Sequence, residues 1–182
     1  GLNAKGIISS IISPTEVLDG AIVSGNCAAP CHKNATIHHQ NNPIVLEILR
    51  RHGKELCFLG VIITNESTML IDKKRGAFYT EKLAKILGAE GAIITEEGGG
   101  NPETDLMLNC KNLEKAGIKT VLITDEYAGR DGRSQGLADV TPEADAVITN
   151  GKGNQLVTLP PMDKVIGSLE SVEIITGGFS GS

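Results

Sequence analysis

The sequence contains no tryptophan and few aromatic side chains of any kind. Phe and Tyr together make up 3% of the 182 residues, and 22 acidic residues stand against 17 basic ones, which gives a net charge of -5. Proteins that bind nucleic acid usually present a basic surface and aromatic rings on which bases stack. We therefore expect no nucleic-acid partner.

Long apolar runs are also missing. No segment approaches the roughly 18 apolar residues of a membrane-spanning helix, and residues 1–5 lack the charged and apolar regions of a signal peptide. The four cysteines are irregularly spaced, with Cys57 inside a strand pattern and Cys110 inside a helix pattern. That arrangement is not typical of a disulfide framework. We expect a cytoplasmic protein with reduced thiols and no membrane span.

Four short apolar runs share one ending, in which a threonine is followed by acidic or amide side chains. They occupy residues 61–66, 92–97, 121–126 and 146–150. Helical periodicity between the first three predicts strand–helix–strand units, and therefore parallel strands whose C-terminal ends lie on one side of a sheet. We predict an α/β fold with three layers, in which a mostly parallel sheet carries helices on both faces. Ligands bind beyond such strand ends, so the repeat predicts an acid-rich site there.

Capping signals and apolar periodicity predict the remaining elements. We expect helices from Asn42-Pro43 to Gly53, over 74–87, from Asn101-Pro102 to Gly117, and a short one beginning at 141–143. The second should carry its apolar stripe on Tyr79, Leu83, Ile86 and Leu87, and the third should bury Leu106, Cys110 and Leu113. Further strands are expected at 6–13 and 21–24, linked by a turn at Pro14, at 56–64, and at 156–159 and 172–175.

Two loops at the predicted strand ends are candidate substrate-binding segments. Gly99, Gly100 and Asn101 lie where a strand end meets a helix start, a position at which backbone N–H groups suit a phosphate or carboxylate. The loop matches neither the dinucleotide fingerprint nor the P-loop, and a tight turn without a ligand is an equal alternative. Arg130 could clamp a substrate carboxylate, although arginines in glycine-rich loops are more often solvated.

Cysteine and histidine are concentrated in residues 27–39, at Cys27, Cys31, His32, His38 and His39. Three interpretations compete. Thiolates and imidazoles could bind zinc. The segment could be a plain loop with a buried cysteine. Cys27 could instead be reactive, because the preceding Gly25-Asn26 pair tolerates strained backbone angles and imidazoles carry protons.

Several longer motifs resemble component B of the glycine, sarcosine and betaine reductases of amino-acid-fermenting anaerobes. They occupy residues 12–17, 19–27, 39–43, 99–102, 124–132 and 160–167. The resemblance is to the proprotein that yields the alpha and beta chains, and it runs over nearly the whole sequence. It implies that residues 1–26 end the upstream beta-chain part and that 27–182 form the α/β domain of the alpha chain, possibly truncated at its C-terminus.

The resemblance also implies a chemistry. In that family the precursor cuts itself between Asn and Cys, here Asn26 and Cys27, and the cysteine becomes a pyruvoyl group. The pyruvoyl carbonyl forms a Schiff base with the amine of glycine, sarcosine or a related substrate. The implied partners are a selenocysteine-containing component B subunit, which cleaves the C–N bond reductively, the component A selenoprotein, and the upstream beta chain. The chain alone should therefore be an inactive oxidoreductase subunit.

The residues suggest how these steps could proceed. The Cys27 thiolate would attack the Asn26 carbonyl, and His38 or His39 would carry the proton. Glu97 and Asp125, at the acid-rich rim, could move protons on the substrate amine. No metal is needed under this interpretation. The rival is a non-catalytic α/β ligand-binding or zinc-stabilised module that uses Cys27, Cys31 and His38 or His39.

Overall fold

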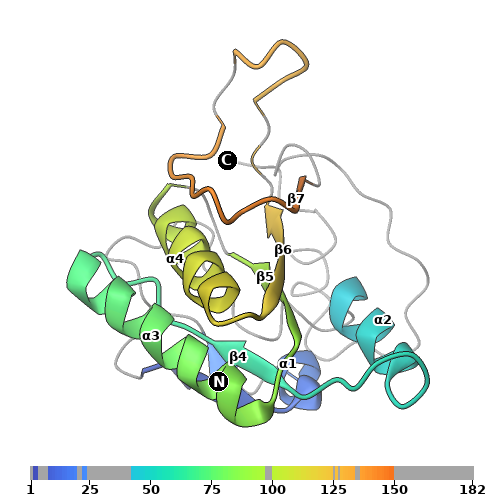
Figure 1. The fold of residues 1–182 in the computed structure, drawn as a ribbon. Helices are drawn as coiled ribbons and strands as arrows, with labels where there is room; N and C mark the ends of the chain where they lie inside the picture. The colour runs from blue at the N-terminus through green and yellow to red at the C-terminus, as the bar shows by residue number, and fades with distance from the viewer. Residues whose placement is uncertain are drawn as a thin grey trace, which may run out of the picture.

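The computed structural model describes residues 8–19, 42–96, 100–124, 126, 128–133 and 136–149, together with the backbone of 2–3 and 22–23. Its elements follow one another along the chain as Figure 1 shows. They are β1 (Leu2–Asn3), β2 (Ser10–Ile12), α1 (Pro14–Asp19), β3 (Ile22–Val23), α2 (Pro43–Arg51), β4 (Val61–Ile63), α3 (Leu70–Leu87), β5 (Gly91–Thr95), α4 (Asn101–Lys115), β6 (Lys119–Thr124) and β7 (Val147–Thr149).

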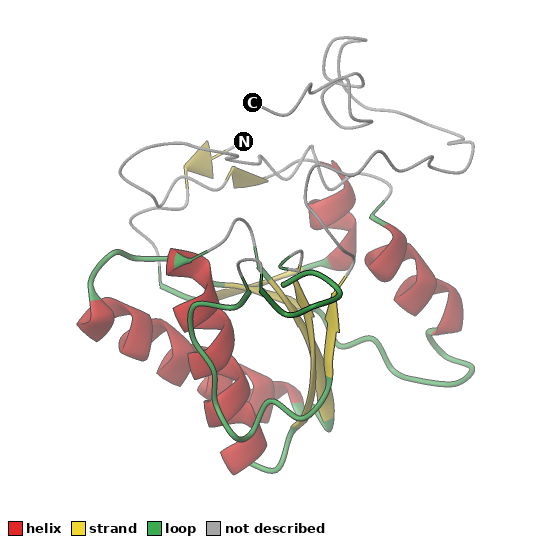
Figure 2. Ribbon diagram, turned by 90° about the horizontal axis from the view of Figure 1, so that it is seen from above, coloured by secondary structure: helices red, strands yellow, loops and turns green. Residues whose placement is uncertain are grey.

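Strands β5, β6 and β7 form a parallel sheet in that order, with Ile93 opposite Val121 and Ile123 opposite Ile148. Helices α3 and α4 pack together on one side of it, and α2 lies on the other (Figure 1). The view from above in Figure 2 likewise shows helices on both sides of the strands. The predicted α/β class with parallel strands is confirmed. Its core joins residues of α4 and β6: Leu106, Met107, Cys110 and Leu122.

Strand β4 departs from the prediction, because it does not join the parallel sheet within the described residues. It pairs antiparallel with β2, where Ser10 lies opposite Ile63 and Ile12 opposite Val61. A second core stabilises this ladder, in which Ile12, Val17 and Val45 are buried. The strand is also shorter than the predicted 56–64. The N–H of Phe58 donates to His52 Nδ1 at 2.9 Å, so this backbone group is used outside any ladder.

The predicted turn at Pro14 is wrong, because residues 14–19 form helix α1. The carboxylate of Glu16 accepts a hydrogen bond from Ser13 N at 2.6 Å, and Glu16 N donates to Ser13 O at 3.0 Å. Ser13-Pro14-Thr15-Glu16 is therefore the start signal of a helix, with a serine before a first-turn proline and a glutamate three residues on. The predicted helix beginning at 141–143 is also wrong, because this segment forms a single turn and no helix.

Helices α2 and α4 are confirmed, and α3 is longer than predicted. Asn42 Oδ1 accepts from Ile44 N and Val45 N at the start of α2, and α4 buries the expected Leu106, Cys110 and Leu113. Helix α3 begins four residues before the predicted 74. The strands predicted at 156–159 and 172–175 lie outside the described residues.

The buried face of α3 is not the predicted one. Its buried residues are Lys73, Ala77, Thr80 and Ala84, whereas Ile86 is 79% exposed. Tyr79, Leu83 and Leu87 are half-buried. Small side chains on the inner face let α4 pack closely against α3. This packing, and not the apolar stripe predicted from the sequence, decides which face of α3 is buried. In the part of the chain that the structure describes, no helix is both long enough and apolar enough to cross a membrane.

Candidate functional site

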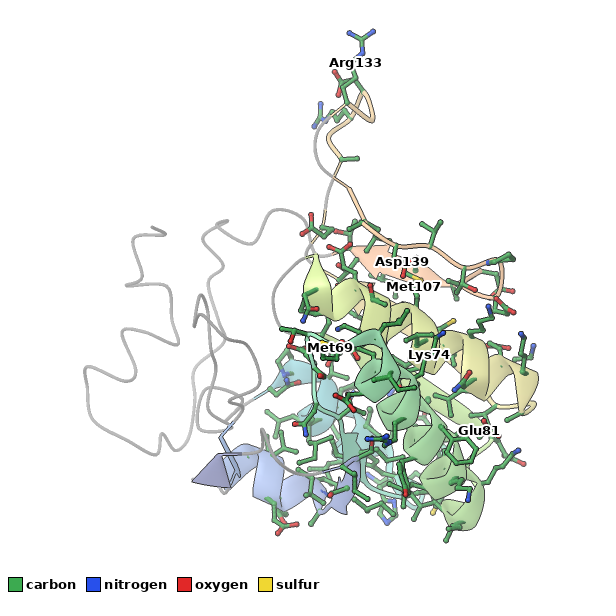
Figure 3. All side chains as sticks on the ribbon, turned by 90° about the vertical axis from the view of Figure 1, so that its left-hand side faces the viewer. Met69, Lys74, Glu81, Met107, Arg133 and Asp139 are labelled. Carbon is green, nitrogen blue, oxygen red and sulfur yellow. The ribbon has the colours of Figure 1, made fainter. Side chains whose placement is uncertain are left out.

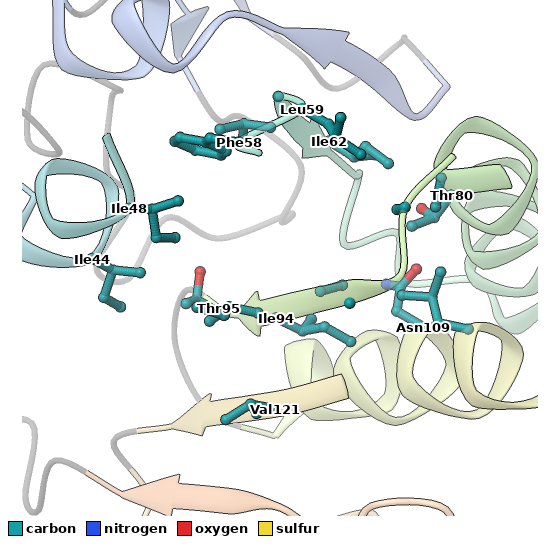
Figure 4. A pocket seen from close by; sticks show the side chains of 18 of the residues that line it. Ile44, Ile48, Phe58, Leu59, Ile62, Thr80, Ile94, Thr95, Asn109 and Val121 are labelled. Carbon is teal, nitrogen blue, oxygen red and sulfur yellow. The ribbon is translucent and has the colours of Figure 1, made fainter. Parts of the chain in front are cut away.

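A cavity of about 760 Å³ lies between the two sheets, bordered by β4 on one side and β5 on the other. Figure 4 shows Ile44, Ile48 and Phe58 at one end and Thr80 and Asn109 at the other. The first end is apolar and adjoins α2. The second adjoins α3 and α4. Glu66 and Asp105 also line the cavity. A cavity with an apolar body and a few convergent polar groups is the usual form of a small-molecule site.

Asp105, which lines the cavity, forms an ion pair that joins α3 to α4. Lys73 Nζ donates to Asp105 Oδ2, and the two side chains are only 5% and 7% exposed. The same ammonium donates to the backbone oxygen of Asn101 at 2.9 Å. Burial raises the pKa of Asp105 from 3.8 to about 6, and Lys73 opposes part of this rise. A carboxyl that titrates near neutral pH can give or accept a proton, which makes Asp105 a candidate acid–base group.

Two asparagines extend this cluster. Asn109 Nδ2 donates to Asp105 O at 2.8 Å, which fixes the orientation of the amide and points Oδ1 away from that carbonyl. No described residue donates to the buried Oδ1. Asn101 Nδ2 donates at 3.1 Å to the backbone oxygen of Glu66, the acidic residue that follows β4. The start of α4 is therefore attached to the first of the acid-tipped strand ends.

The repeated threonine–acid ending forms a chain of hydrogen bonds along the C-terminal edge of the parallel sheet. Thr124 Oγ1 donates to Glu96 Oε1 at 2.8 Å and accepts from Glu126 N at 3.1 Å. Thr149 Oγ1 then donates to Glu126 O at 2.6 Å. Three strand ends are linked in this way. The predicted acidic rim thus includes Glu96 and Glu126, and the threonines hold the carboxylate of Glu96 and the backbone of Glu126.

In the predicted anion-binding loop at residues 99–101, the described residue Gly100 takes part in the cap of α4. Gly100 N donates to Glu103 Oε1 at 2.7 Å, and the other oxygen of Glu103 accepts from Ala138 N. Glu103 is fully buried. One N–H group at the start of α4 is therefore already satisfied by a carboxylate of the protein itself. Binding of substrate by Gly100 and Asn101 stays a prediction.

Arg130 is exposed in the turn formed by residues 128–133. Figure 3 shows its neighbour Arg133 at the far end of a projection from the body of the molecule. The structure therefore does not place Arg130 in the cavity, and its role as a carboxylate clamp is a prediction.

The other predicted site residues lie outside the described residues. They are Asn26, Cys27, Cys31, His32, His38, His39, Glu97, Gly99 and Asp125. Within the described ranges, no group of three or more His, Cys, Asp or Glu side chains could hold a metal ion.

Sequence reasoning missed Lys73, Asp105 and Asn109. The signal was present, because Asp105 and Asn109 are one helical turn apart and each precedes a buried apolar residue, Leu106 or Cys110. Polar side chains at the spacing of a buried stripe need partners in the interior. Lys73 is likewise one helical turn before the buried Ala77 and two turns before the buried Thr80, so it lies on the buried face of α3.

Asp105 is expected to make the stability of the fold depend on pH. Its folded pKa of about 6 exceeds the ordinary 3.8, so between these values the folded chain binds more protons than the unfolded chain. The free energy of unfolding should then fall as the pH rises from about 4 to about 6. Urea denaturation at a series of pH values should show a smaller fall for Asp105→Asn. Equal slopes in the two proteins would contradict the assignment.

Comparison with known proteins gives the family. Residues 1–182 match the family model of glycine/sarcosine/betaine reductase component B subunits. The chain is 56% identical over 182 residues to the glycine reductase complex component B subunits alpha and beta of Peptoclostridium acidaminophilum, and 55% identical over 181 residues to the sarcosine reductase complex component B subunit alpha of the same organism. All of the chain is covered, against 42% of each relative.

Two further relatives are less similar in sequence. The betaine reductase complex component B subunit alpha of Peptoclostridium acidaminophilum is 42% identical over 183 residues, which covers all of this chain and 41% of that protein. A D-proline reductase proprotein of Acetoanaerobium sticklandii is 30% identical over 120 residues, 64% of this chain and 18% of that protein. No solved structure matches. The chain spans about two fifths of the length of its nearer relatives, and it belongs to the family of glycine/sarcosine/betaine reductase component B subunits.

Proposed function

We propose that this chain is the pyruvoyl-bearing, substrate-binding part of component B in a reductase for glycine or an N-methylated glycine. The observation that carries the proposal is the family match over residues 1–182, a span that includes the Asn26-Cys27 pair. One relative, the D-proline reductase protein, is a proprotein, which supports a processing step. The acidic rim and the polar cavity support a site for an amine.

In the proposed processing step, the Cys27 thiolate attacks the Asn26 carbonyl carbon. The C–N bond between the two residues breaks and a thioester replaces it. β-Elimination then removes the sulfur as a thioacid, which water hydrolyses to a carboxyl group on Asn26 and hydrogen sulfide. The dehydroalanine that remains takes up water and releases ammonia, which leaves a pyruvoyl group at position 27. His38 or His39 would carry the protons.

The pyruvoyl carbonyl would condense with the substrate amine and withdraw electrons from its C–N bond, as a diffusible cofactor does elsewhere. Protons on the amine would be moved by carboxyl groups of the chain. Glu97 and Asp125 are candidates from the sequence, and Asp105 is a candidate from the structure because its pKa is raised to about 6. A selenocysteine on a separate subunit would deliver the electrons, so the chain alone would not turn over.

The test is the intact mass of the full-length protein under denaturing conditions, after expression with its partner subunits. We expect two fragments divided at Asn26-Cys27. The later fragment should be lighter than one with an N-terminal cysteine and should react with hydrazines. A single unbroken chain in an active complex would overturn the proposal.

A further inference from the structure

Helix α3 carries a second apolar stripe on the side that faces away from α4. Ile71, Phe78 and Ile86 are 63%, 48% and 79% exposed. Their spacings of seven and eight residues place them on one face. The buried residues Lys73, Ala77, Thr80 and Ala84 lie on the opposite face. We call the outer side, with Ile71, Lys74, Phe78, Lys82 and Ile86, the α3 face.

The two lysines of the α3 face, Lys74 and Lys82, form no ion pair among the residues that the structure describes. Arg75 pairs with Asp72 at 3.0 Å and Lys85 with Glu81 at 2.7 Å, which leaves Lys74 and Lys82 without an ion pair among the described residues. Lys82 Nζ lies 4.8 Å from the centre of the Phe78 ring. Figure 3 shows Met69, Lys74 and Glu81 along the length of α3 toward the viewer.

The charge of α3 is opposite to that of the whole chain. The helix contains five basic residues and two acidic ones, whereas the chain has a net charge of -5. Its apolar surface also continues past the helix start, since Met69 and Leu70 are 60% and 53% exposed. Soluble proteins seldom expose a contiguous apolar patch of this kind without a partner for it. Lysines beside apolar side chains favour a partner that offers carboxylates around an apolar centre.

We propose that the α3 face is the docking surface for an acidic subunit of the reductase complex. In the assembled complex, Ile71, Phe78 and Ile86 are buried against apolar side chains of that subunit, and carboxylates of the subunit pair with Lys74 and Lys82. The proposal concerns assembly. It does not depend on Cys27 or on the pyruvoyl group.

Lysine labelling of the complex tests the contact directly. The full-length protein is acetylated with a water-soluble reagent, alone and in the purified complex, and each site is measured by peptide mass spectrometry. We expect Lys74 and Lys82 to be acetylated less in the complex than in the isolated protein, because a stable interface excludes the reagent from the side chains that it buries. Lys119, which begins β6 and whose side chain is 85% exposed, serves as the control and should react equally in both samples.

Substitution tests the energetics. Ile86→Glu and Lys82→Glu should each weaken association by about tenfold or more, because each puts a new carboxylate against the acidic partner. Val140→Glu changes an apolar residue that is 75% exposed on a loop outside α3, and it should leave association unchanged. Sedimentation of the complexes at low and high salt gives the affinities, and thermal melting shows that the variants are folded. Raised salt should weaken the wild-type complex.

Each other outcome overturns the proposal. Equal labelling of Lys74 in both samples would mean that the partner subunit does not cover the face. Stronger binding by Lys82→Glu would mean that the partner is basic. Lys74 and Lys82 could instead become protected in the isolated protein at high concentration, while sedimentation shows twice the mass of one chain. That result would mean that a second copy of the protein covers the face. Fragment masses measured in the same samples report separately on cleavage at Asn26-Cys27.

Discussion

Replacement of Cys27 by alanine is expected to leave the chain unbroken between residues 26 and 27 and to abolish turnover by the complex. Alanine has no nucleophile to attack the Asn26 carbonyl, and it cannot lose a sulfur to become a ketone. The intact mass should show one fragment where the wild type gives two, and labelling with hydrazine should disappear. The expected loss of activity is complete rather than partial, because the electrophile itself is missing.

Cys31→Ala is the matched control. It removes a thiol four residues away and should be cleaved and labelled like the wild type. If Cys31→Ala instead loses stoichiometric zinc and the wild type stays unbroken, the zinc-stabilised module would be the correct interpretation. An active complex that still carries a free thiol at position 27 would contradict the pyruvoyl mechanism.

Replacement of Lys73 by methionine should destabilise the fold by about 3–5 kcal/mol at pH 8, because it leaves the buried carboxylate of Asp105 without its partner. Urea denaturation measures the loss. It should shrink as the pH falls toward about 6 and stay constant below that, because without Lys73 the pKa of Asp105 rises further and the variant protonates this group before the wild type does. A loss that is independent of pH would indicate that the methylene stem of Lys73, and not its charge, supports the packing of α3 on α4.

The double variant Lys73→Met, Asp105→Leu separates the charge pair from the space that it fills. Apolar side chains of similar size usually replace a buried pair at little cost, so the double variant should lie within about 1 kcal/mol of the wild type. It should therefore be more stable than either single variant. Additive losses would show that the two side chains act independently.

The parts of the fold that were predictable are those in which the signal is local. Asn42-Pro43 and Asn101-Pro102 mark the starts of α2 and α4, and both helices form where expected. The three parallel strands follow from the repeated endings and from the helices between them. Ser13-Pro14-Thr15-Glu16 is equally local, and the start of α1 could have been recognised from it.

Other features depend on contacts between distant segments. Nothing within residues 61–63 indicates that β4 pairs with residues 10–12 rather than with β5. The inner face of α3 is chosen in part by α4, whose Leu113 clusters with Ala84 and whose Asp105 pairs with Lys73. An apolar pattern cannot reveal such a face, because the deciding side chains are small or charged.

The candidate site divides in the same way. The acidic rim was predictable from the repeated endings, and Glu96 and Glu126 lie on it. The polar groups Asp105 and Asn109 in the cavity, with Lys73 as the partner of Asp105, required the structure, since these residues come from two helices. The roles proposed for Cys27, His38 and His39 rest on the family match and on the chemistry of these side chains, because the structure does not describe them.

The cavity between β4 and β5 also affects how the two halves of the molecule stay together. Within the described residues the two sheets share no backbone hydrogen bonds, and they meet where Ile62 and Ile94 pack on Ala84, Leu113 and Ile118. Apolar attraction weakens on cooling, whereas backbone ladders depend on it less. Chilling should therefore loosen this junction before it loosens either sheet.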